Sequence, residues 1–192
     1  MKKSIGAKAI LFPAPVLVVA TFDVDGKPNA MTAAWGGICC SDPPCVTVSL
    51  RKATYTYNSL MEKKVYTINI PGKEFAKEAD YLGIASGRDN DKFAATGLTP
   101  IRSDHVDAPY IKEFPVCLEC KIVHIADLGL HTMFVGEVID AKVDDSLLDD
   151  NRQPMIEQVM PLVFATNSRN YYTIGEELGR AFSIGKEIMN KS

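Results

Sequence analysis

The sequence predicts a mainly β fold with added helices: an antiparallel barrel, closed by its strands, with the helices packed around it. Segments rich in β-branched residues outnumber segments with helical spacing. The strand segments follow one another as hairpins, without the regular strand–helix alternation of a doubly wound sheet. With 192 residues, 46% of them apolar, the chain can bury a large core in one unit. We therefore expect a single domain over residues 1–192.

A hairpin is predicted near the start of the chain. Residues 16–24 are mostly apolar and rich in valine, and Asp25-Gly26 comes directly after them. Asp-Gly between two extended runs is a strong hairpin signal because both turn positions need positive φ. The return strand is expected over residues 28–35. Further on, the pattern predicts strands over 45–50 and 65–70 and a helix over 54–64.

The second half of the chain contains the longest strands. Helices are predicted over residues 74–82 and 90–95, and the segment 85–93 is polar and rich in turn residues. Two long strands, over 117–125 and 132–143, are joined near Gly129. The remaining predicted elements are a partial helix over 146–159, short strands over 162–165 and 171–174, and a loop with partial helix over 176–189.

Charge and hydropathy exclude two classes of partner. The chain has 21 Lys and Arg against 24 Asp and Glu, so its formal net charge is −3. This balance lacks the basic footprint of a nucleic-acid-binding protein. No apolar run approaches the roughly 20 residues that a membrane-spanning helix needs. We expect neither nucleic acid nor membrane as a partner.

The amino terminus and the cysteines bear on the compartment. Lys2 and Lys3 precede an apolar stretch over residues 10–22, which imitates a secretory signal. Pro13 and Pro15 interrupt that stretch, so a buried first strand is the better interpretation. Five cysteines is an odd number, which favours reduced thiols in a cytoplasmic protein over a disulfide framework.

The segment 29–37 combines small residues with a few polar and aromatic ones. Five of its nine residues are alanine or glycine, which would let a large flat molecule approach the backbone. Asn29 and Thr32 add hydrogen-bonding groups, and Trp35, the single tryptophan, adds an aromatic plane. The alternative is a strand packed against a helix or a second subunit, which this segment taken alone slightly favours.

The segment 49–58 has the pattern of a phosphate site. Arg51 and Lys52 end a predicted strand, and a helix opens directly after them with Thr54 as its N-cap. The free amides of a helix N-terminus bind phosphate, Arg51 can add two parallel bonds, and Thr56 a hydroxyl. The alternative is an ordinary capped helix beside two solvated cations, and the spacing alone does not decide between them.

Two further segments contain candidate polar groups. Arg88 and Lys92 lie in the turn-rich segment 85–93, which as a flexible loop would bring both cations over a bound anion. The alternative, an ordinary surface turn, is the commoner case. His131 opens the strand 132–143 and could donate to a ligand or relay a proton. Its alternative is a solvent-exposed histidine or one bonded to backbone.

Several catalytic and metal motifs are absent from the sequence. Cys117 and Cys120 have the spacing of a metal knuckle, but no second such pair follows. In an extended strand these two side chains would also point to opposite faces. We find no GxSxG elbow, Walker loop or GxGxxG fingerprint. We therefore expect no metal site, and no Rossmann unit for a nicotinamide nucleotide.

Taken together, these segments resemble the flavin reductase-like FMN-binding proteins, and in particular their flavoredoxin branch. The resemblance covers nearly the whole chain, from Phe12-Pro-Ala-Pro15 to the late Gly-Lys at 185–186. Its most specific part is Asn29-Ala-Met-Thr-Ala-Ala-Trp35. It also includes Ser49-Leu-Arg-Lys-x-Thr-Tyr-Thr56, Ser86-Gly-Arg-Asp-x-Asp-Lys-Phe93 and His131-Thr-x-Phe-x-Gly-Glu-Val138.

The resemblance implies a split β-barrel of Greek-key type that forms a homodimer, with FMN held non-covalently near the dimer interface. Around the ribityl phosphate it would place Ser49, Leu50, Arg51, Thr54 and Thr56, with Lys92 as a second cation from the loop. Along the isoalloxazine ring it would place Asn29, Met31, Thr32 and Ala33, with Trp35 toward the phosphate end, His131 near the reactive edge and Phe164 packed on the flavin.

The resemblance leaves three functions open. The first is an electron-transfer flavoprotein, flavoredoxin-like, which exchanges electrons with redox donors and acceptors. The second is a reductase in which NADH or NADPH passes hydride to the flavin, which then reduces free flavin or a ferric complex. The third is a non-catalytic flavin-binding module. We rank the electron-transfer protein first. Cys39, Cys40 and Cys45 lie near the ring-bordering strand, and for them inert buried thiols are the preferred interpretation over a redox role.

Overall fold

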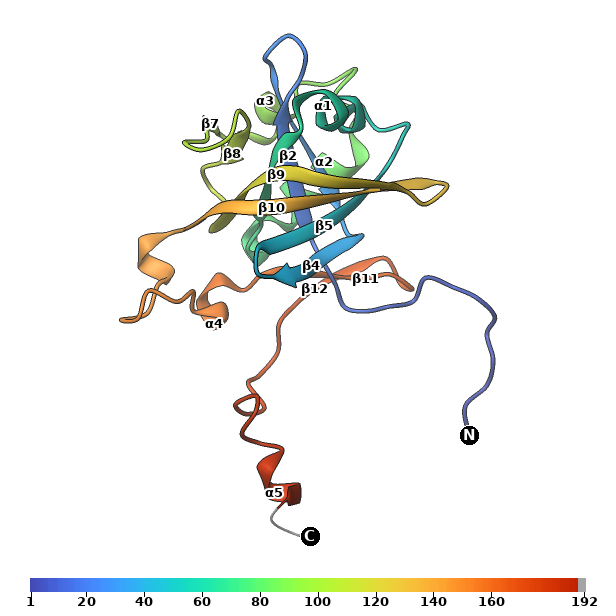
Figure 1. Cartoon of the computed structure of the whole chain (residues 1–192), viewed down its shortest axis with the longest axis vertical. Coiled ribbons are helices and arrows are strands. Elements are labelled where there is room, and N and C mark those ends of the chain that lie inside the picture. The colour runs from blue at the N-terminus through green and yellow to red at the C-terminus, as the bar shows by residue number, and fades with distance from the viewer. Residues whose placement is uncertain (190–192) are drawn as a thin grey trace.

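The structure, a computed structural model, describes residues 1–189 and is built around one curled seven-stranded sheet (Figure 1). Its strand order is β3-β2-β6-β9-β10-β5-β4, and all its neighbouring strands are antiparallel. The bounds are β2 Leu17–Phe22, β3 Pro28–Ala33, β4 Gly36–Ser41, β5 Pro44–Arg51, β6 Val65–Ile70, β9 Val116–Asp127 and β10 His131–Val143.

This sheet has two edges, β3 and β4, and is therefore open. The expectation of a mainly β fold with added helices is confirmed, while the expectation of closure by the strands is wrong. The chain crosses the gap through residues 34 and 35, where the amide of Ser49 donates to the carbonyl of Trp35 at 2.7 Å. The opening lies beside the small residues of β3, and this is where the candidate site is found.

Helices lie outside the sheet, and those between residues 55 and 96 pack against it. They are α1 Tyr55–Lys63, α2 Ala76–Ile84, α3 Lys92–Thr96, α4 Ile156–Val159 and α5 Lys186–Met189, with short 3-10 turns at Lys73–Phe75 and Asp145–Leu147. Within the described residues 1–189, no helix combines the length and the hydropathy needed to cross a bilayer. The helices predicted at 54–64, 74–82 and 90–95 are confirmed, with bounds shifted by a few residues.

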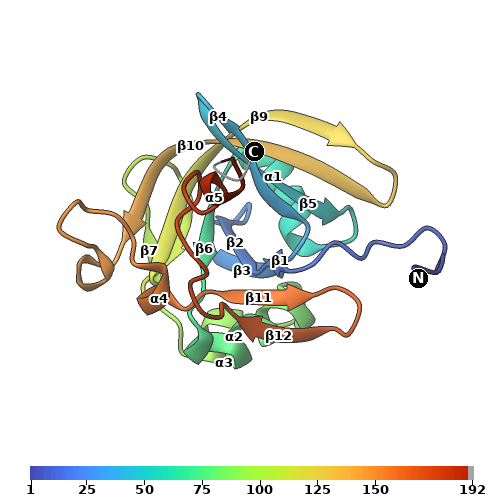
Figure 2. The same ribbon diagram turned by 90° about the horizontal axis from the view of Figure 1, so that it is seen from below.

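Two small sheets complete the fold. β1 Ala14–Pro15, β11 Leu162–Ala165 and β12 Asn170–Thr173 form one, and β7 Pro100–Arg102 pairs with β8 Pro109–Ile111 in the other. The β11–β12 hairpin lies beside α2 (Figure 2), and the hydroxyl of Tyr171 donates to Asp80 of that helix at 3.0 Å. This contact brings the late part of the chain to the opening of the main sheet.

Two hydrophobic cores lie on opposite faces of β2. Val16, Val18 and Ala20 pack with Leu82 of α2 in one core, whereas Leu17 and Val19 belong to the other, which contains Leu60 of α1. Because both faces of β2 are buried, its sequence is a continuous apolar run rather than an alternating one. Strand β2 thus fixes α1 and α2, and with them both sides of the opening.

Candidate functional site

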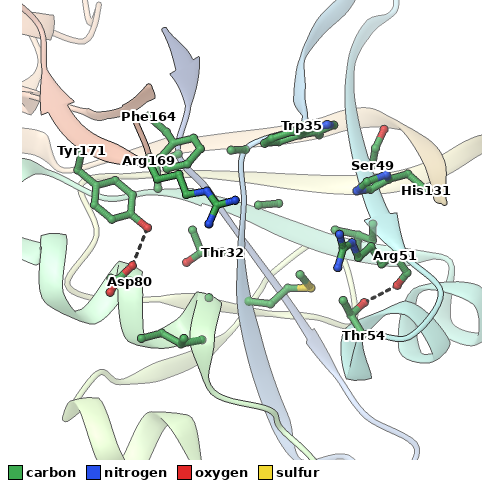
Figure 3. A pocket seen from close by; sticks show the side chains of 17 residues that line it. Thr32, Trp35, Ser49, Arg51, Thr54, Asp80, His131, Phe164, Arg169 and Tyr171 are labelled. Atoms are coloured by element: carbon green, nitrogen blue, oxygen red, sulfur yellow. Dashed lines mark hydrogen bonds between the residues drawn. The ribbon is translucent and has the colours of Figure 1, made fainter. Parts of the chain in front are cut away.

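A cavity of about 420 Å³ lies at the opening of the main sheet (Figure 3). Its volume is in the range of small-molecule sites, roughly 300–1,000 Å³. Strands β3 and β5, the start of β10, helix α2 and the β11–β12 hairpin contribute its walls. The lining residues are Val16, Met31, Thr32, Ala33, Ala34, Trp35, Ser49, Leu50, Arg51, Thr54, Asp80, Gly83, Ile84, His131, Phe164, Arg169 and Tyr171.

The β3 wall is lined largely by short side chains. Ala33 and Ala34 leave space next to the backbone, and Met31 is the longest side chain of the strand that reaches the cavity. The hydroxyl of Thr32 donates to the carbonyl of Ala79 in α2, which ties the strand to the helix. This wall is held in place by α2 and leaves room for a flat apolar molecule next to the backbone of edge strand β3.

The opposite corner is formed by the end of β5 and the start of α1. Thr54 is the N-cap residue, as predicted, but its hydroxyl donates to the Arg51 carbonyl at 2.9 Å and makes no capping bond. Among the hydrogen bonds of residues 1–189, none involves the amides of Tyr55 and Thr56. These two donors and the helix dipole make the corner attractive to an anion.

The Arg51 side chain points into the cavity from this corner (Figure 3). Within the described part of the chain, no carboxylate forms an ion pair with it. The adjacent cation is different, because Lys52 forms an ion pair with Asp127. Of the two cations predicted at this strand end, Arg51 is thus the one whose charge remains available to a ligand.

A second cavity, of about 220 Å³, adjoins the first and shares Met31, Thr54, Gly83 and Ile84 with it. Its other walls come from the start of α1 and from the segment 85–88. Gly87 approaches β3 so closely that a Cβ there would lie 2.3 Å from Asn29 Oδ1. A side chain at this position would collide with its neighbours, so the close approach of the segment to β3 requires a glycine.

The segment 85–93, for which the sequence allowed a flexible loop over an anion or an ordinary surface turn, is held by contacts with its neighbours. Arg88 donates to the Ala53 carbonyl at 3.0 Å and lies over the Tyr55 ring, 5.8 Å from its centre. Lys92 is the first residue of α3 and is buried, where the expectation was a cation carried on a flexible loop. Contacts with α1 and β3 therefore hold both cations in place.

The Lys92 ammonium lies at the wall of the second cavity. It donates to the carbonyls of Ala30 and Leu82, both at 2.8 Å, and so joins edge strand β3 to the end of α2. An ammonium has three donors, so one remains for a ligand. Burial lowers the pKa of Lys92 from 10.5 to about 8. A bound anion would favour the protonated form and raise this pKa again.

Asn29 and Thr56 are paired with each other beneath the second cavity. Both residues are buried, and Asn29 Nδ2 donates to Thr56 Oγ1 at 2.8 Å. Thr56 reaches the wall of the second cavity, but Asn29 lines neither cavity. Asn29 therefore fixes the start of α1 relative to β3. The sequence placed it along the flavin ring, but its side chain does not line the larger cavity.

Trp35 and His131 form a stacked pair at one end of the larger cavity. Their ring centres are 6.3 Å apart and the planes differ by 11°. His131 is also the register partner of Arg51 across the β5–β10 ladder. The histidine therefore lies at the Arg51 end of the cavity, next to Trp35 and Ser49 (Figure 3).

Phe164, Tyr171 and Arg169 form the far end of the larger cavity. The Phe164 and Tyr171 rings are 5.7 Å apart, and Asp80 accepts the Tyr171 hydroxyl. Burial and this hydrogen bond raise the pKa of Tyr171 to about 12, so the phenol stays protonated. Arg169 is exposed at the hairpin turn, and its guanidinium points toward the space between Trp35 and Thr32 (Figure 3).

The structure brings most of the predicted site residues together. The larger cavity is lined by Met31, Thr32, Ala33, Trp35, Ser49, Leu50, Arg51, Thr54, His131 and Phe164, and the smaller one by Met31, Thr54, Thr56 and Lys92. Sequence reasoning missed Val16, Asp80, Gly83, Ile84, Arg169 and Tyr171 as lining residues, whereas Ala34 belongs to the small-residue segment 29–37 that it singled out. Asp80 lay within the predicted helix 74–82, whereas Gly83 lay just beyond its predicted end, which the structure extends to Ile84. Arg169 gave no signal.

Comparison with known proteins gives a consistent result. The family model described as "Flavin reductase like domain" matches residues 9–175. The flavoredoxin of Desulfovibrio vulgaris (Miyazaki F) is 52% identical, with a TM-score of 0.92 over 96% of this chain and 100% of that one. The flavoredoxin from Methanosarcina acetivorans is 29% identical, with a TM-score of 0.92 over 98% and 100% of the two chains.

A third structure bears on the fold. It is a putative flavin reductase with a split barrel domain from Shewanella frigidimarina NCIMB 400, 24% identical to this chain. The TM-score is 0.78, and the match covers 87% of this chain and 84% of that one. The open main sheet is therefore a split barrel.

Proposed function

The chain belongs to the family of flavin reductase-like domains, and from this premise we propose that it binds FMN non-covalently in the two adjoining cavities and transfers electrons through it. The proposal rests on one observation. Arg51, with no ion pair among the described residues, and the two free amides of α1 adjoin a cavity whose β3 wall is built from small side chains. This combination suits a ligand with an anionic tail and a flat apolar head.

The tail of FMN fits the corner between the two cavities. In our proposal Arg51 holds the phosphate through parallel charge-assisted bonds, and the amides of residues 55 and 56 donate to the remaining oxygens. Ser49, Leu50 and Thr54 form the walls around the tail, and Thr56 adds a hydroxyl. The ammonium of Lys92 supplies a second positive charge from the floor of the smaller cavity.

The head of FMN fits the larger cavity. Met31, Thr32 and Ala33 border the ring in our proposal, and Phe164 packs on it from the far side. Trp35 and His131 flank the ring at the Arg51 end, where the histidine can donate to it. When bound, FMN supplies the oxidation–reduction chemistry, while the protein supplies its position and surroundings. With its hydroxyl bonded to Ala79, Thr32 helps to hold the β3 wall in place.

Electron transfer without a bound nucleotide is the first of two candidate activities, by analogy with the two flavoredoxins. One observation favours the second, a reductase that uses NADH or NADPH. Arg169 is exposed at the mouth of the larger cavity, and no described carboxylate forms an ion pair with it. Such a cation could hold a phosphate of a nicotinamide nucleotide above the flavin.

Anaerobic mixing of the FMN-loaded protein with NADH or NADPH separates the two activities. An electron-transfer protein is expected to keep its flavin absorption band for many minutes with either nucleotide and to bleach at once with dithionite. Bleaching within seconds by one nucleotide would contradict our first choice and establish the reductase. In that case Arg169→Gln should slow the bleaching, whereas Lys52→Gln, a change to a cation paired with Asp127, should not.

We also propose that the chain forms a homodimer through its two terminal arms, residues 1–12 and 174–189. Both arms extend away from the body (Figure 1). They expose large apolar side chains, among them Leu11 at 88% and Phe182 at 97%. Apolar groups that project so far into water are typical of a surface that another chain covers. A second copy of this chain is the partner we propose.

The dimer has a direct test in sedimentation equilibrium. The unaltered protein is expected at twice the chain mass, and the double change Leu178→Asp with Phe182→Asp is expected to shift it toward the monomer, because two charges would then enter an apolar contact. Val24→Asp provides the control, since Val24 is also exposed but lies at the tip of the β2–β3 hairpin. A monomeric unaltered protein would contradict the proposal.

The thiols support a reducing compartment. All five cysteines are free in the structure. Disulfides form in oxidising compartments and are rare in the cytosol. We propose on this ground that the protein acts in the cytoplasm, as one domain over residues 1–192.

A further inference from the structure

Three of the five cysteines lie together on the β4–β5 hairpin, outside the cavities described above. Cys39 and Cys40 are exposed on β4, which is an edge of the main sheet, and Cys45 is buried on β5. Cys40 and Cys45 are directly opposite each other in the antiparallel register of the two strands. The hairpin turn, residues 41–44, is all that separates them along the chain.

Direct opposition satisfies the spacing that a disulfide needs. Opposite residues of an antiparallel pair have Cα atoms about 4.5 or 5.5 Å apart, depending on the hydrogen-bond pattern. The Cα atoms of a disulfide are about 4.4–6.8 Å apart. Either register spacing falls in that range, so Cys40 and Cys45 require no movement of the strands to be joined.

Cys39 differs from its neighbour in this register. The pairing shifts between Ile38 and Cys40, so Cys39 is the extra residue of a β-bulge and has no partner in the ladder. The three thiols are nevertheless close enough to interact. Burial raises the pKa of the Cys45 thiol, and the nearby Cys40, Cys39 and Glu137 raise it further. Cys39 is thus a matched control for Cys40, because it is also exposed but has no partner in the ladder.

The two paired thiols differ in solvent exposure, and this difference sets the order in which they react. Cys40 is open to solvent, and its thiol donates to the Asp42 carbonyl at 3.4 Å. Cys45 is protected by the sheet. A reagent in solution therefore reacts with the Cys40 thiol first. Cys45, opposite Cys40 in the ladder, is then placed to attack the modified Cys40 sulfur. Among residues 1–189, no three His, Cys, Asp or Glu side chains are arranged to hold a metal ion.

We propose that Cys40 and Cys45 are a thiol pair that oxidises to a disulfide by exchange with a low-molecular-weight disulfide such as oxidised glutathione. The Cys40 thiolate attacks one sulfur of glutathione disulfide, forming a mixed disulfide and releasing one glutathione thiolate. The Cys45 thiolate then attacks the Cys40 sulfur and releases the second glutathione. The two cysteines lose two electrons and two protons, and the glutathione disulfide gains them.

The site is separate from the proposed flavin cavities but lies on the strands that lead to them. β4 follows Trp35 directly, and β5 continues from Cys45 to Ser49 and Arg51. The disulfide would fasten edge strand β4 to β5 next to the turn. The inference does not depend on FMN, so its test remains valid whether or not the protein binds a flavin.

The test uses the full chain with all five thiols reduced at the start. The protein is equilibrated with glutathione disulfide, blocked with N-ethylmaleimide, and weighed intact and as fragments. The unaltered protein is expected to contain a disulfide between Cys40 and Cys45, identified in its fragments by a mass two units below that of the reduced pair. Cys39→Ser should form the same crosslink at a similar rate.

The other variants exclude different pairings. Cys40→Ser should form no internal disulfide, and Cys45→Ser should stop at a glutathione adduct on Cys40. Cys45→Ala repeats the second test in case serine disturbs the buried position. A crosslink between Cys39 and Cys45, a crosslink between Cys39 and Cys40, or five open thiols in the oxidised protein would each overturn the proposal.

Discussion

Arg51→Ala is expected to weaken FMN binding by about 30- to 1,000-fold. Arg51 has no ion pair among the described residues and points into the larger cavity, next to the free amides of α1. A hydrogen bond to a charged group is worth roughly 1.5–3 kcal/mol, two such bonds from one guanidinium add less than fully, and each 1.4 kcal/mol is about tenfold in affinity. Titration of the apoprotein with FMN, followed by quenching of flavin fluorescence, measures the change.

Two controls make this expectation specific to the phosphate. Lys52→Ala removes the adjacent cation, which is paired with Asp127, and should leave FMN affinity within about twofold. Riboflavin lacks the phosphate, so Arg51→Ala should bind it as the unaltered protein does. An equal loss of affinity for FMN and riboflavin would show that Arg51 acts on the fold or the ring and would remove it from the phosphate site.

FMN affinity is also expected to fall above pH 8, by up to about tenfold per pH unit. The pKa of Lys92 is lowered by burial from 10.5 to about 8, so its ammonium loses its proton in this range in the empty protein. A bound phosphate favours the protonated ammonium, and binding above pH 8 therefore requires uptake of a proton. Below pH 8 the ammonium is already charged, and the affinity should be nearly independent of this residue's titration.

Substitutions at Lys92 distinguish the effect of its positive charge on FMN affinity from the effect of its loss of a proton above pH 8. Lys92→Met should bind FMN weakly and with little change between pH 7 and 10, because no proton is taken up. Lys92→Arg keeps a permanent charge and should also give a flat profile, but at higher affinity. Lys77→Met, which changes an exposed cation on α2, should retain the profile of the unaltered protein. A steep profile in Lys92→Met would assign the titration to another group.

Much of the fold could be predicted because local and tertiary preferences agree. The hairpin at Asp25-Gly26 and the strands at 65–70 and 162–165 lie where the pattern of apolar residues predicts them. Strand β4 was missed because Gly36, Gly37 and two cysteines have little strand preference; its pairing with β5 supplies the missing stability. Strands β7 and β8 were not predicted, because each has only three residues, too few for a strand pattern to appear in the sequence.

The site was predictable where a motif is local and not where distant segments meet. Met31, Arg51 and Thr54, from the motifs at 29–35 and 49–56, line one cavity. Tertiary contacts decide the remainder. Lys92 is buried because the carbonyls of Ala30 and Leu82 accept its donors, and no local pattern shows that. Arg169 reaches the cavity only because the β11–β12 hairpin packs against α2.

The identity of the cofactor in the purified native protein tests the central claim most directly. The cofactor is released by heating and analysed by chromatography and mass. Our account predicts FMN, in a ratio approaching one per chain after reconstitution, because the cation-lined corner selects a mononucleotide with a single terminal phosphate. A colourless protein that takes up no FMN, or one that releases a different ligand from these cavities, would contradict it.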